Sequence, residues 1–166
     1  DVGGGEGAFA VAALRANPRL HATVFDLPSV VARAPARFAA GGVAARAATA
    51  AGSFLEDDLP GGFDAISLVR VCYDHSDARV RAVLAKARAA LPSGGMILVT
   101  EPMSGGARPT RSGDAYFGFY LAAMRSGRAR SPERHAALLR EAGFAEIRRP
   151  RVRRPFITEV VTARAP

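Results

Sequence analysis

The first seven residues pair an acidic side chain with a run of glycines, in the pattern Asp-x-Gly-x-Gly-x-Gly over Asp1–Gly7. Glycines such as Gly3 and Gly5 let the backbone turn tightly and approach a ligand closely. A helix beginning after them would offer free N–H groups and the positive end of its dipole. An acidic residue at the head of the loop disfavours a phosphate and favours a cationic ligand. The pattern indicates a nucleotide-like ligand, but Gly3-x-Gly5-x-x-Ala8 also fits a dinucleotide loop, and a plain glycine-rich turn remains open.

A second acidic residue, Asp26, follows the short strand expected at His21–Phe25. It lies about 20 residues beyond the glycine loop, where an acidic side chain can accept hydrogen bonds from ribose hydroxyls. Asp26 could also cap the helix that begins at Pro28, and the two roles are compatible. We favour ribose binding.

Segments typical of strands alternate with segments typical of helices along the chain. The apolar runs Ala65–Val69 and Met96–Val99 are of the kind buried on both faces of a parallel sheet. Such alternation predicts an α/β, Rossmann-like, mostly parallel sheet whose last two strands form an antiparallel pair. The expected helices are Gly7–Ala16, Pro28–Ala40, Ser76–Leu91, Asp114–Met124 and Ser131–Ala142, and the expected strands are His21–Phe25, Val43–Ala50, Phe63–Val71, Met96–Thr100, Phe144–Arg149 and Phe156–Ala163.

A glycine loop of this type follows a strand, yet Asp1 is the first residue. We therefore expect the first strand of the sheet to be truncated. Residues 1–166 are expected to form a single catalytic domain of a longer protein.

Composition and charge narrow the class of protein. Cys72 is the only cysteine, which excludes an internal disulfide and points to a reducing, cytoplasmic setting. The net charge of +8 comes almost wholly from arginine, Lys86 being the one lysine. No aromatic residues interleave with the densest arginine cluster, so we expect no nucleic-acid partner and favour a solvated patch that could face a membrane surface. That cluster comprises Arg148, Arg149, Arg151, Arg153 and Arg154. No Cys, His and carboxylate cluster has metal-ligand spacing, so no metal is expected.

Several motifs together carry a resemblance to a known family. They are the glycine loop, Phe-Asp-Leu-Pro at Phe25–Pro28, Gly-Ser-Phe at Gly52–Phe54, Asp-Ala-Ile-Ser-Leu at Asp64–Leu68 and Leu-Pro-x-Gly-Gly…Glu-Pro-Met at Leu91–Met103. With them the chain resembles class I S-adenosylmethionine (SAM)-dependent O-methyltransferases of the plant caffeate and acetylserotonin type. A narrower likeness is to the bacterial carotenoid hydroxyneurosporene (demethylspheroidene) O-methyltransferases. It rests on Leu68–Asp77, Gly105–Pro109 and Asp114–Phe117.

The resemblance implies a seven-stranded class I methyltransferase fold and a SAM site. Asp1, Gly3 and Gly5 would hold the methionine end of the cofactor, Asp26 with Leu27 the ribose, and Ser53 with Phe54 the adenine. Arg70, at the end of the fourth strand, would face the carboxylate region of the cofactor or the mouth of the acceptor site. A plain surface charge at Arg70 remains an alternative.

The resemblance leaves the catalytic base open. Tyr73-Asp74-His75 stands where plant relatives have His-Asp-Trp, so Tyr73 occupies the position of the base. A neutral histidine suits proton abstraction near neutral pH, whereas a tyrosine with a pKa near 10 does not. Either His75 serves from two residues further on, or catalysis comes mainly from holding the reacting atoms in line. Glu101 matches a glutamate that steadies the histidine in plant relatives, and a second such glutamate is replaced by Ala129.

The resemblance also implies the substrate and partners. We expect methyl transfer to a hydroxyl of a small hydrophobic acceptor, most simply an acyclic hydroxylated carotenoid, with a phenol or polyketide as the alternative. The aromatic residues of Asp114–Met124 would divide between core and acceptor pocket. Relatives dimerise through a helical N-terminal domain that is absent here, so the full protein is expected to be a homodimer. A nicotinamide-dependent oxidoreductase and an RNA-binding or RNA-modifying module are remoter alternatives.

Overall fold

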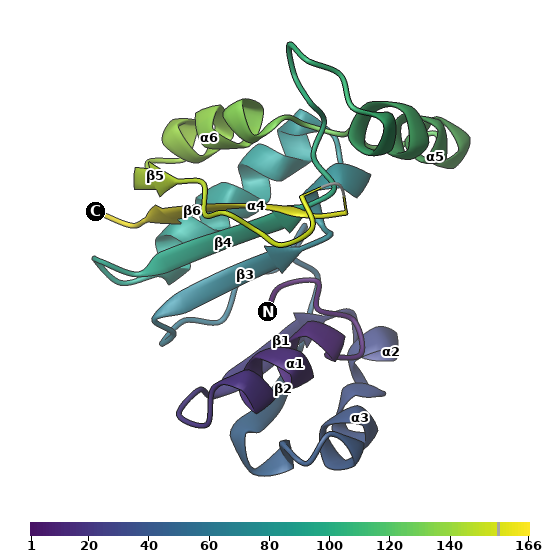
Figure 1. Ribbon diagram of the computed structural model, residues 1–166. Helices are drawn as coiled ribbons and strands as arrows, with labels where there is room; N and C mark the ends of the chain where they lie inside the picture. Colours follow the sequence, from purple (N-terminus) through teal and green to yellow (C-terminus); the bar gives the residue numbers. More distant parts are fainter. Residues whose placement is uncertain (156) are drawn as a thin grey trace. The chain divides into compact units, whose positions relative to one another are not determined.

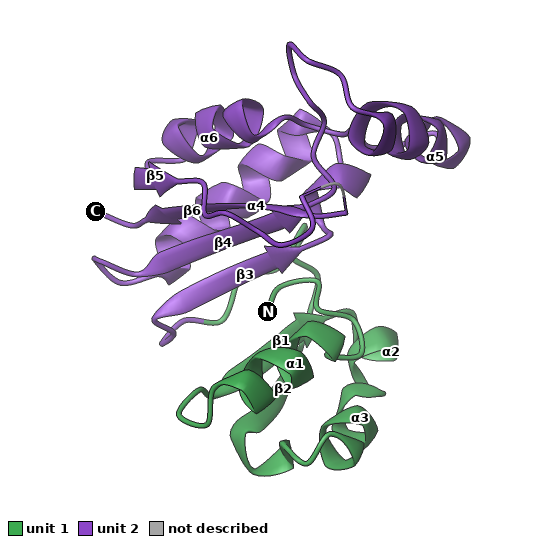
Figure 2. Cartoon of the chain, viewed as in Figure 1, with its two compact units in different colours: residues 1–60 green, residues 61–166 purple. Residues whose placement is uncertain are grey.

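The computed structural model describes residues 1–155 and 157–166. The chain forms two compact units, Asp1–Pro60 and Gly61–Pro166, which Figures 1 and 2 show in the same view. Each unit is described below by itself.

The first unit is a parallel strand pair covered by helices. Strand β1 (Ala22–Asp26) pairs with β2 (Ala47–Ala51), so that Ala22 lies beside Ala47 and Asp26 beside Ala51. Helix α1 (Ala8–Ala16) begins directly after the glycine loop and ends at Asn17, as the sequence predicted. The core of this unit is a cluster of buried apolar side chains from α1, from β1 and from residues 31–43. They are Ala10, Leu14, Val24, Val31, Ala34, Phe38 and Val43.

Two expectations for this unit were wrong in detail. The helix expected over Pro28–Ala40 is divided into α2 (Pro28–Val31) and α3 (Ala34–Ala40). Pro35 explains the break, because it has no N–H for the carbonyl of Val31 and its ring clashes with that carbonyl.

The strand expected over Val43–Ala50 begins later than predicted, after the 3-10 turn η1 (Ala44–Arg46). The Arg46 guanidinium holds this turn, since it donates to the carbonyls of Leu14, Asn17 and Leu20. The strand pattern alone could not reveal these distant partners.

The second unit is a four-stranded mixed sheet in the order β3-β4-β6-β5. Strands β3 and β4 are parallel, whereas β6 is antiparallel to both β4 and β5, which confirms the antiparallel last pair. The strands are β3 (Ala65–Val69), β4 (Met96–Glu101), β5 (Ala145–Arg148) and β6 (Glu159–Arg164). The described residues therefore contain six strands in two sheets, not the expected single sheet of seven. Phe156, the first residue of the expected last strand, lies outside the described residues.

Two helices of this unit, α4 and α6, begin at serines. Ser76 caps α4 (Asp77–Ala90) and Ser131 caps α6 (Pro132–Glu141), each hydroxyl accepting a hydrogen bond from the N–H three residues on. Helix α6 packs on β5, β6 and α4. A short 3-10 turn, η2 (Cys72–Asp74), joins β3 to α4.

The helix expected over Asp114–Met124 was wrong at its start. It consists of a π-helical turn, η3 (Arg111–Tyr116), followed by α5 (Phe117–Met124). The wider turn is held by Asp114, whose carboxylate accepts hydrogen bonds from the N–H groups of Gly105 and Thr110. The turn thus begins at Thr110, whose hydroxyl accepts from the N–H of Gly113.

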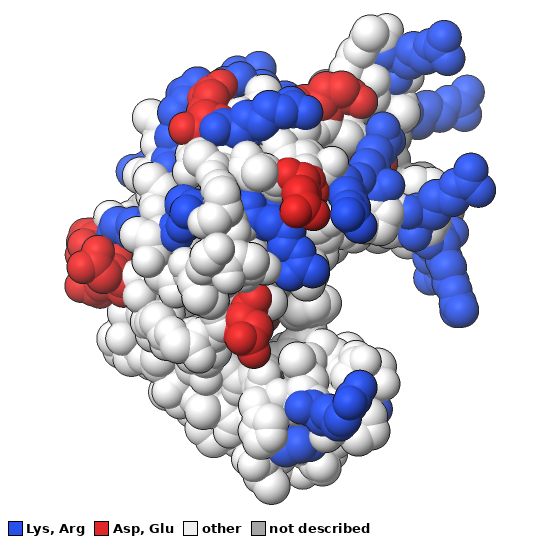
Figure 3. Space-filling view, turned by 90° about the vertical axis from the view of Figure 1, so that its left-hand side faces the viewer, with Lys and Arg blue, Asp and Glu red and all other residues white. Residues whose placement is uncertain are grey.

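Arginine dominates the charged surface in view in Figure 3. Part of the cluster at residues 148–154 is ion-paired: Arg149 with Glu159 and Glu133, and Arg148 with Glu146. None of the helices in the described ranges has the length and apolar character needed to cross a bilayer.

Candidate functional site

The glycine loop turns through three left-handed residues. Gly3, Gly5 and Gly7 have φ values of 66°, 60° and 82°, a region that residues with a Cβ enter only at a cost. Their spacing in the sequence therefore reflects a real backbone requirement. Gly7 is also the residue directly before α1.

Two glycines of the loop have close neighbours, and one of them, Gly4, was not singled out from the sequence. A Cβ at Gly4 would lie 2.5 Å from an Asp1 carboxylate oxygen, so Asp1 packs directly against the loop backbone. A Cβ at Gly7 would lie 2.5 Å from the Phe38 ring. The unbroken run of three glycines before Glu6 was the available signal.

Asp26 is joined to the glycine loop through its carboxylate. One oxygen accepts from the N–H of Gly5 at 2.7 Å and the other from the N–H of Leu27 at 2.7 Å. Leu27, not Asp26, is the N-cap residue of α2, so the capping role considered for Asp26 is wrong. Each carboxylate oxygen still has acceptor capacity for a further donor, such as a ribose hydroxyl.

The candidate adenine residues follow β2, the strand that neighbours β1, and Asp26 is the last residue of β1. The N–H of Gly52 donates to the Asp26 carbonyl at 3.0 Å, which places Ser53 and Phe54 directly after this contact. Asp57 closes the turn by accepting from the N–H of Ser53 at 2.8 Å. Asp1, Gly3, Gly5, Asp26, Ser53 and Phe54 thus all belong to the first unit and gather at the carboxyl ends of its strands.

In the second unit, Arg70 lies against aromatic side chains. Its guanidinium donates to the Tyr73 hydroxyl at 3.3 Å and lies 5.5 Å from the centre of the Tyr73 ring and 5.8 Å from that of Phe117. Arg70 itself has a φ of 59°, unusual for a side-chain-bearing residue. Backbone strain at a strand end, held by a cation–π contact, is typical of a functional position.

Tyr73 is buried and poorly suited to take a proton. It packs with Phe117, Leu121 and Ala129, and its ring stacks on that of Tyr120. Burial raises the pKa of the Tyr73 hydroxyl above its usual value near 10, although the Arg70 hydrogen bond acts in the other direction. The phenol is therefore protonated at neutral pH.

His75 is a half-buried imidazole at the start of α4. Burial, together with the positive charges of Arg79 and Arg130, lowers its pKa below the usual 6.5, although Asp74 acts the other way. The ring is consequently neutral at neutral pH and able to accept a proton.

Glu101, the last residue of β4, is completely buried. One carboxylate oxygen accepts from the N–H groups of Val71 and Cys72, at 3.0 and 2.7 Å. Burial raises its pKa to about 7, although the hydrogen bonds from Cys72 and Val71 oppose this. Glu101 therefore holds the backbone just before Tyr73.

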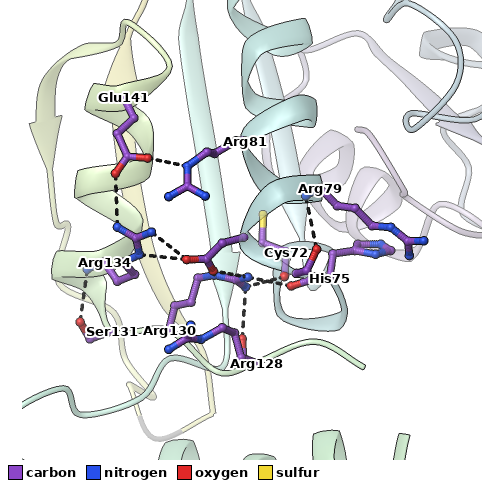
Figure 4. Close-up of polar contacts among 11 residues, drawn as sticks. Cys72, His75, Arg79, Arg81, Arg128, Arg130, Ser131, Arg134 and Glu141 are labelled. Atoms are coloured by element: carbon purple, nitrogen blue, oxygen red, sulfur yellow. Dashed lines mark hydrogen bonds and ion pairs between the residues drawn. The ribbon is translucent and has the colours of Figure 1, made fainter. Parts of the chain in front are cut away.

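Sequence reasoning also missed Arg130, a fully buried arginine shown in Figure 4. Its guanidinium donates to the carbonyls of Cys72 and His75, each at 2.7 Å, and to the carboxylate of Asp77 at 2.8 Å. Arginine is so abundant in the chain that no sequence signal distinguished this one.

A cavity of about 510 Å³ opens beside this region. Leu121 and Ala129 line it and also pack with Tyr73, so its wall is shared with the Tyr73 cluster. The other lining residues are Ser104, Asp114, Gly118, Ala122, Arg125, Ser126, Gly127 and Arg128.

The aromatic residues expected to divide between core and pocket do so only in part. Phe117 is core, whereas Tyr116, Phe119 and Met124 are exposed. From α5, the cavity is lined by Gly118, Leu121 and Ala122 instead of the aromatic side chains. The described parts of the chain contain no group of three or more His, Cys, Asp or Glu residues that could hold a metal ion.

Comparisons with known proteins agree with this geometry. Residues 1–145 match the family described as O-methyltransferase domain. The chain is 51% identical to a demethylspheroidene O-methyltransferase from Cereibacter sphaeroides over 100% of its own length and 44% of that protein. It is 49% identical to the protein of the same name from Rhodobacter capsulatus, over 98% of this chain and 40% of the relative.

A solved structure extends the likeness to three dimensions. Human N-acetylserotonin methyltransferase in complex with SAM superposes with a TM-score of 0.87 at 28% identity, over 99% of this chain and 46% of that one. The chain thus spans less than half the length of each of these proteins.

Proposed function

Because the chain belongs to the O-methyltransferase domain family and has a class I SAM-dependent methyltransferase fold, we propose that it binds SAM and transfers the methyl group to a hydroxyl of an acyclic hydroxylated carotenoid. The two relatives near 50% identity, both named demethylspheroidene O-methyltransferases, support the carotenoid acceptor. A cavity lined partly by apolar side chains supports a hydrophobic substrate.

The observation that carries the proposal is the link between Asp26 and the glycine loop. The Asp26 carboxylate fixes the N–H of Gly5 and keeps acceptor capacity for ribose hydroxyls. Asp1 supplies a negative charge at the head of the same loop, suited to the cationic methionine end. The donor and acceptor set of the first unit therefore fits SAM, with Leu27, Ser53 and Phe54 flanking its nucleoside.

When bound, SAM supplies a methyl group activated by a sulfonium, and its transfer to the acceptor oxygen releases S-adenosylhomocysteine and a proton. In our proposal the chain's own residues orient the acceptor and receive that proton. His75 accepts it as a neutral imidazole, Arg70 and Tyr73 shape the site, and Glu101 and the backbone it holds keep these groups in place.

We also propose that the sheet has a seventh strand, which pairs with β1. In the first unit, the N–H of Phe25 donates to the Asp1 carbonyl at 2.9 Å and the N–H of Gly3 donates to the Phe25 carbonyl at 2.8 Å. These alternating bonds, with the parallel bridge of Val2 to Phe25, continue a strand ladder along β1. We infer that a strand leading into Asp1 is this seventh strand. We also infer that residues 1–166 act as one catalytic domain.

Two wider properties are also proposed. The full protein would dimerise through a region outside this chain. It would meet its acceptor at a membrane surface, where a carotenoid dissolves, using exposed arginines such as Arg151 and Arg153.

Gly5→Ala is expected to weaken binding of S-adenosylhomocysteine at least about tenfold, because the new methyl group would occupy space that the ligand needs. A tenfold change in affinity corresponds to about 1.4 kcal/mol. Among the described residues, no atom lies within 4 Å of a Cβ built at Gly5. Isothermal titration calorimetry measures the affinity.

The matched control is Gly42→Ala. Gly42 also has a left-handed φ, 69° against 60° for Gly5, and also faces open space, so the backbone cost is the same. Its affinity should remain that of the wild type. Equal affinities for the two variants would contradict the cofactor site.

His75→Ala is expected to lower kcat about 100-fold or more, the usual size of a lost general base, with little change in cofactor affinity. Tyr73→Phe should lower kcat less than about tenfold, because its protonated phenol is not the base. Initial rates with a hydroxylated acyclic carotenoid give both values. Unchanged turnover in His75→Ala would rule out this role.

The acceptor itself is tested by supplying hydroxylated acyclic carotenoids and, separately, phenolic acids. Methylated carotenoid, identified by mass spectrometry, is the expected product. Methylation of the phenolic acids alone would overturn the carotenoid assignment and leave methyl transfer intact.

A further inference from the structure

The segment that carries Tyr73 and His75 is held by two buried side chains of opposite charge. Residues 71–75, here called the 71–75 segment, join β3 to α4. Glu101 accepts hydrogen bonds from the N–H groups of Val71 and Cys72. Arg130 donates to the carbonyls of Cys72 and His75.

Arg130 uses its guanidinium fully. One terminal nitrogen donates to the Cys72 and Arg128 carbonyls at 2.7 and 3.2 Å, and the other donates to the His75 carbonyl at 2.7 Å and pairs with Asp77 at 2.8 Å. The remaining N–H, on Nε, donates to the same carboxylate. A guanidinium has five N–H donors in a rigid plane, and lysine cannot reproduce that fork.

The ion pair with Asp77 links Arg130 directly to α4, and Arg134 and Glu141 of α6, labelled in Figure 4, extend the network. Asp77, at the start of α4, also pairs with Arg134 of α6 at 2.7 Å, and Arg134 and Arg81 both pair with Glu141. Burial opposes ionisation of Asp77, but the hydrogen bonds from Arg134 and Arg130 lower its pKa to about 2. The guanidinium is thus anchored independently of the segment it holds.

The chain around Arg130 also approaches the 71–75 segment closely. Gly127 has a φ of 76°, and a Cβ there would lie 2.1 Å from the Tyr73 carbonyl oxygen. The N–H of Arg128 donates to the same carbonyl at 2.9 Å. Gly127, Arg128 and Ala129 line the cavity, so one stretch of chain borders both the cavity and the segment.

We propose that Arg130 is a positioning residue for methyl transfer: through the carbonyls of Cys72 and His75 it sets the placement of Tyr73 and His75 beside the cavity. This inference rests on the proposed function. Arg130 acts on the side chains of Tyr73 and His75 through backbone carbonyls.

The test compares Arg130→Lys with Arg134→Met in the full protein. Arg134 shares Asp77, and its other ion pair is with Glu141, so its loss reports the ion-pair network alone. We expect Arg130→Lys to lower kcat about 100-fold, the usual effect of misplacing a group by about 1 Å, and Arg134→Met to leave kcat within about threefold of wild type. The Kd for S-adenosylhomocysteine should be unchanged in both.

Equal kcat losses in the two variants, or an Arg130→Lys kcat within about threefold of wild type, would overturn the proposal. If Arg130→Lys does not fold, Asp77→Asn decides, because it weakens the ion pair that anchors the Arg130 guanidinium. It should lower kcat more than Arg134→Met does, and equal kcat values in these two variants would overturn the proposal.

A readout independent of activity is the titration of the His75 imidazole by NMR. Because the Arg130 charge lowers the pKa of His75, removing it in Arg130→Met should raise that pKa, and Arg134→Met should not. This result stands even if the wild-type protein transfers no methyl group. The failure of the proposed function and the failure of the positioning role are therefore distinguishable.

Discussion

Replacing Gly7 by alanine is expected to lower the free energy of unfolding by about 3 kcal/mol, from left-handed backbone strain of about 1–2 kcal/mol and overpacking of about 1–3 kcal/mol. Gly7 has a φ of 82°, and a Cβ there would lie 2.5 and 3.1 Å from two atoms of the Phe38 ring. Phe38 is only 2% exposed, in the core of the first unit, so the ring has little room to move. Urea unfolding measures the change.

Two controls separate the strain from the clash. Gly42→Ala has a similar φ and no close neighbour, so it should cost only about 1–2 kcal/mol. Phe38→Leu should make room for the new methyl group, so that the double variant loses less stability than the sum of the single changes. Additive losses would show that the contact between residues 7 and 38 is not the cause.

Glu101→Gln is expected to change how stability depends on pH. Burial raises the pKa of Glu101 from its usual 4.5 to about 7. Between these values the folded protein keeps a proton on Glu101 that the unfolded chain has released. The folded state binds more protons, so wild-type stability falls as pH rises from 4.5 through 7, by about 3 kcal/mol in all.

The side-chain amide in Glu101→Gln does not titrate, so the variant does not lose this stability as pH rises. The amide oxygen can still accept hydrogen bonds from the N–H groups of Val71 and Cys72. The difference in free energy of unfolding between Glu101→Gln and wild type should therefore grow in favour of the variant with rising pH. Two neighbouring groups do not titrate in this window, because the pKa of Cys72 is raised by burial and that of Arg70 by its bond to Tyr73.

Urea unfolding of both proteins at several pH values between about 5 and 8 gives the comparison. Glu141→Gln is a suitable control, since ion pairs with Arg81 and Arg134 lower the pKa of that exposed carboxylate. Parallel pH curves for wild type and Glu101→Gln would contradict a raised pKa at Glu101.

Local signals predicted the elements of the fold well. Ser76 and Ser131 were read as helix starts, and both cap helices, because capping depends only on the next few residues. The left-handed glycines of the glycine loop were predictable for the same reason. Pro35 was also a local signal, and the break it causes between α2 and α3 should have been predicted.

Contacts between distant residues were not predictable. Gly7 meets Phe38, Glu101 holds Val71, and Arg130 holds Cys72, and each pair is brought together only by the fold. The family resemblance named Glu101 but could not show that its contacts are with the backbone. It gave no reason to single out Arg130 among so many arginines.

Cys72 lies where its reaction with a thiol reagent reports opening of the 71–75 segment. It is the only thiol in the chain, 1% exposed, in the segment held by Glu101 and Arg130, and burial raises its pKa well above 9. A thiol reagent can reach it only while that segment is open. The rate of alkylation at Cys72 therefore measures how often the segment carrying Tyr73 and His75 leaves its folded position.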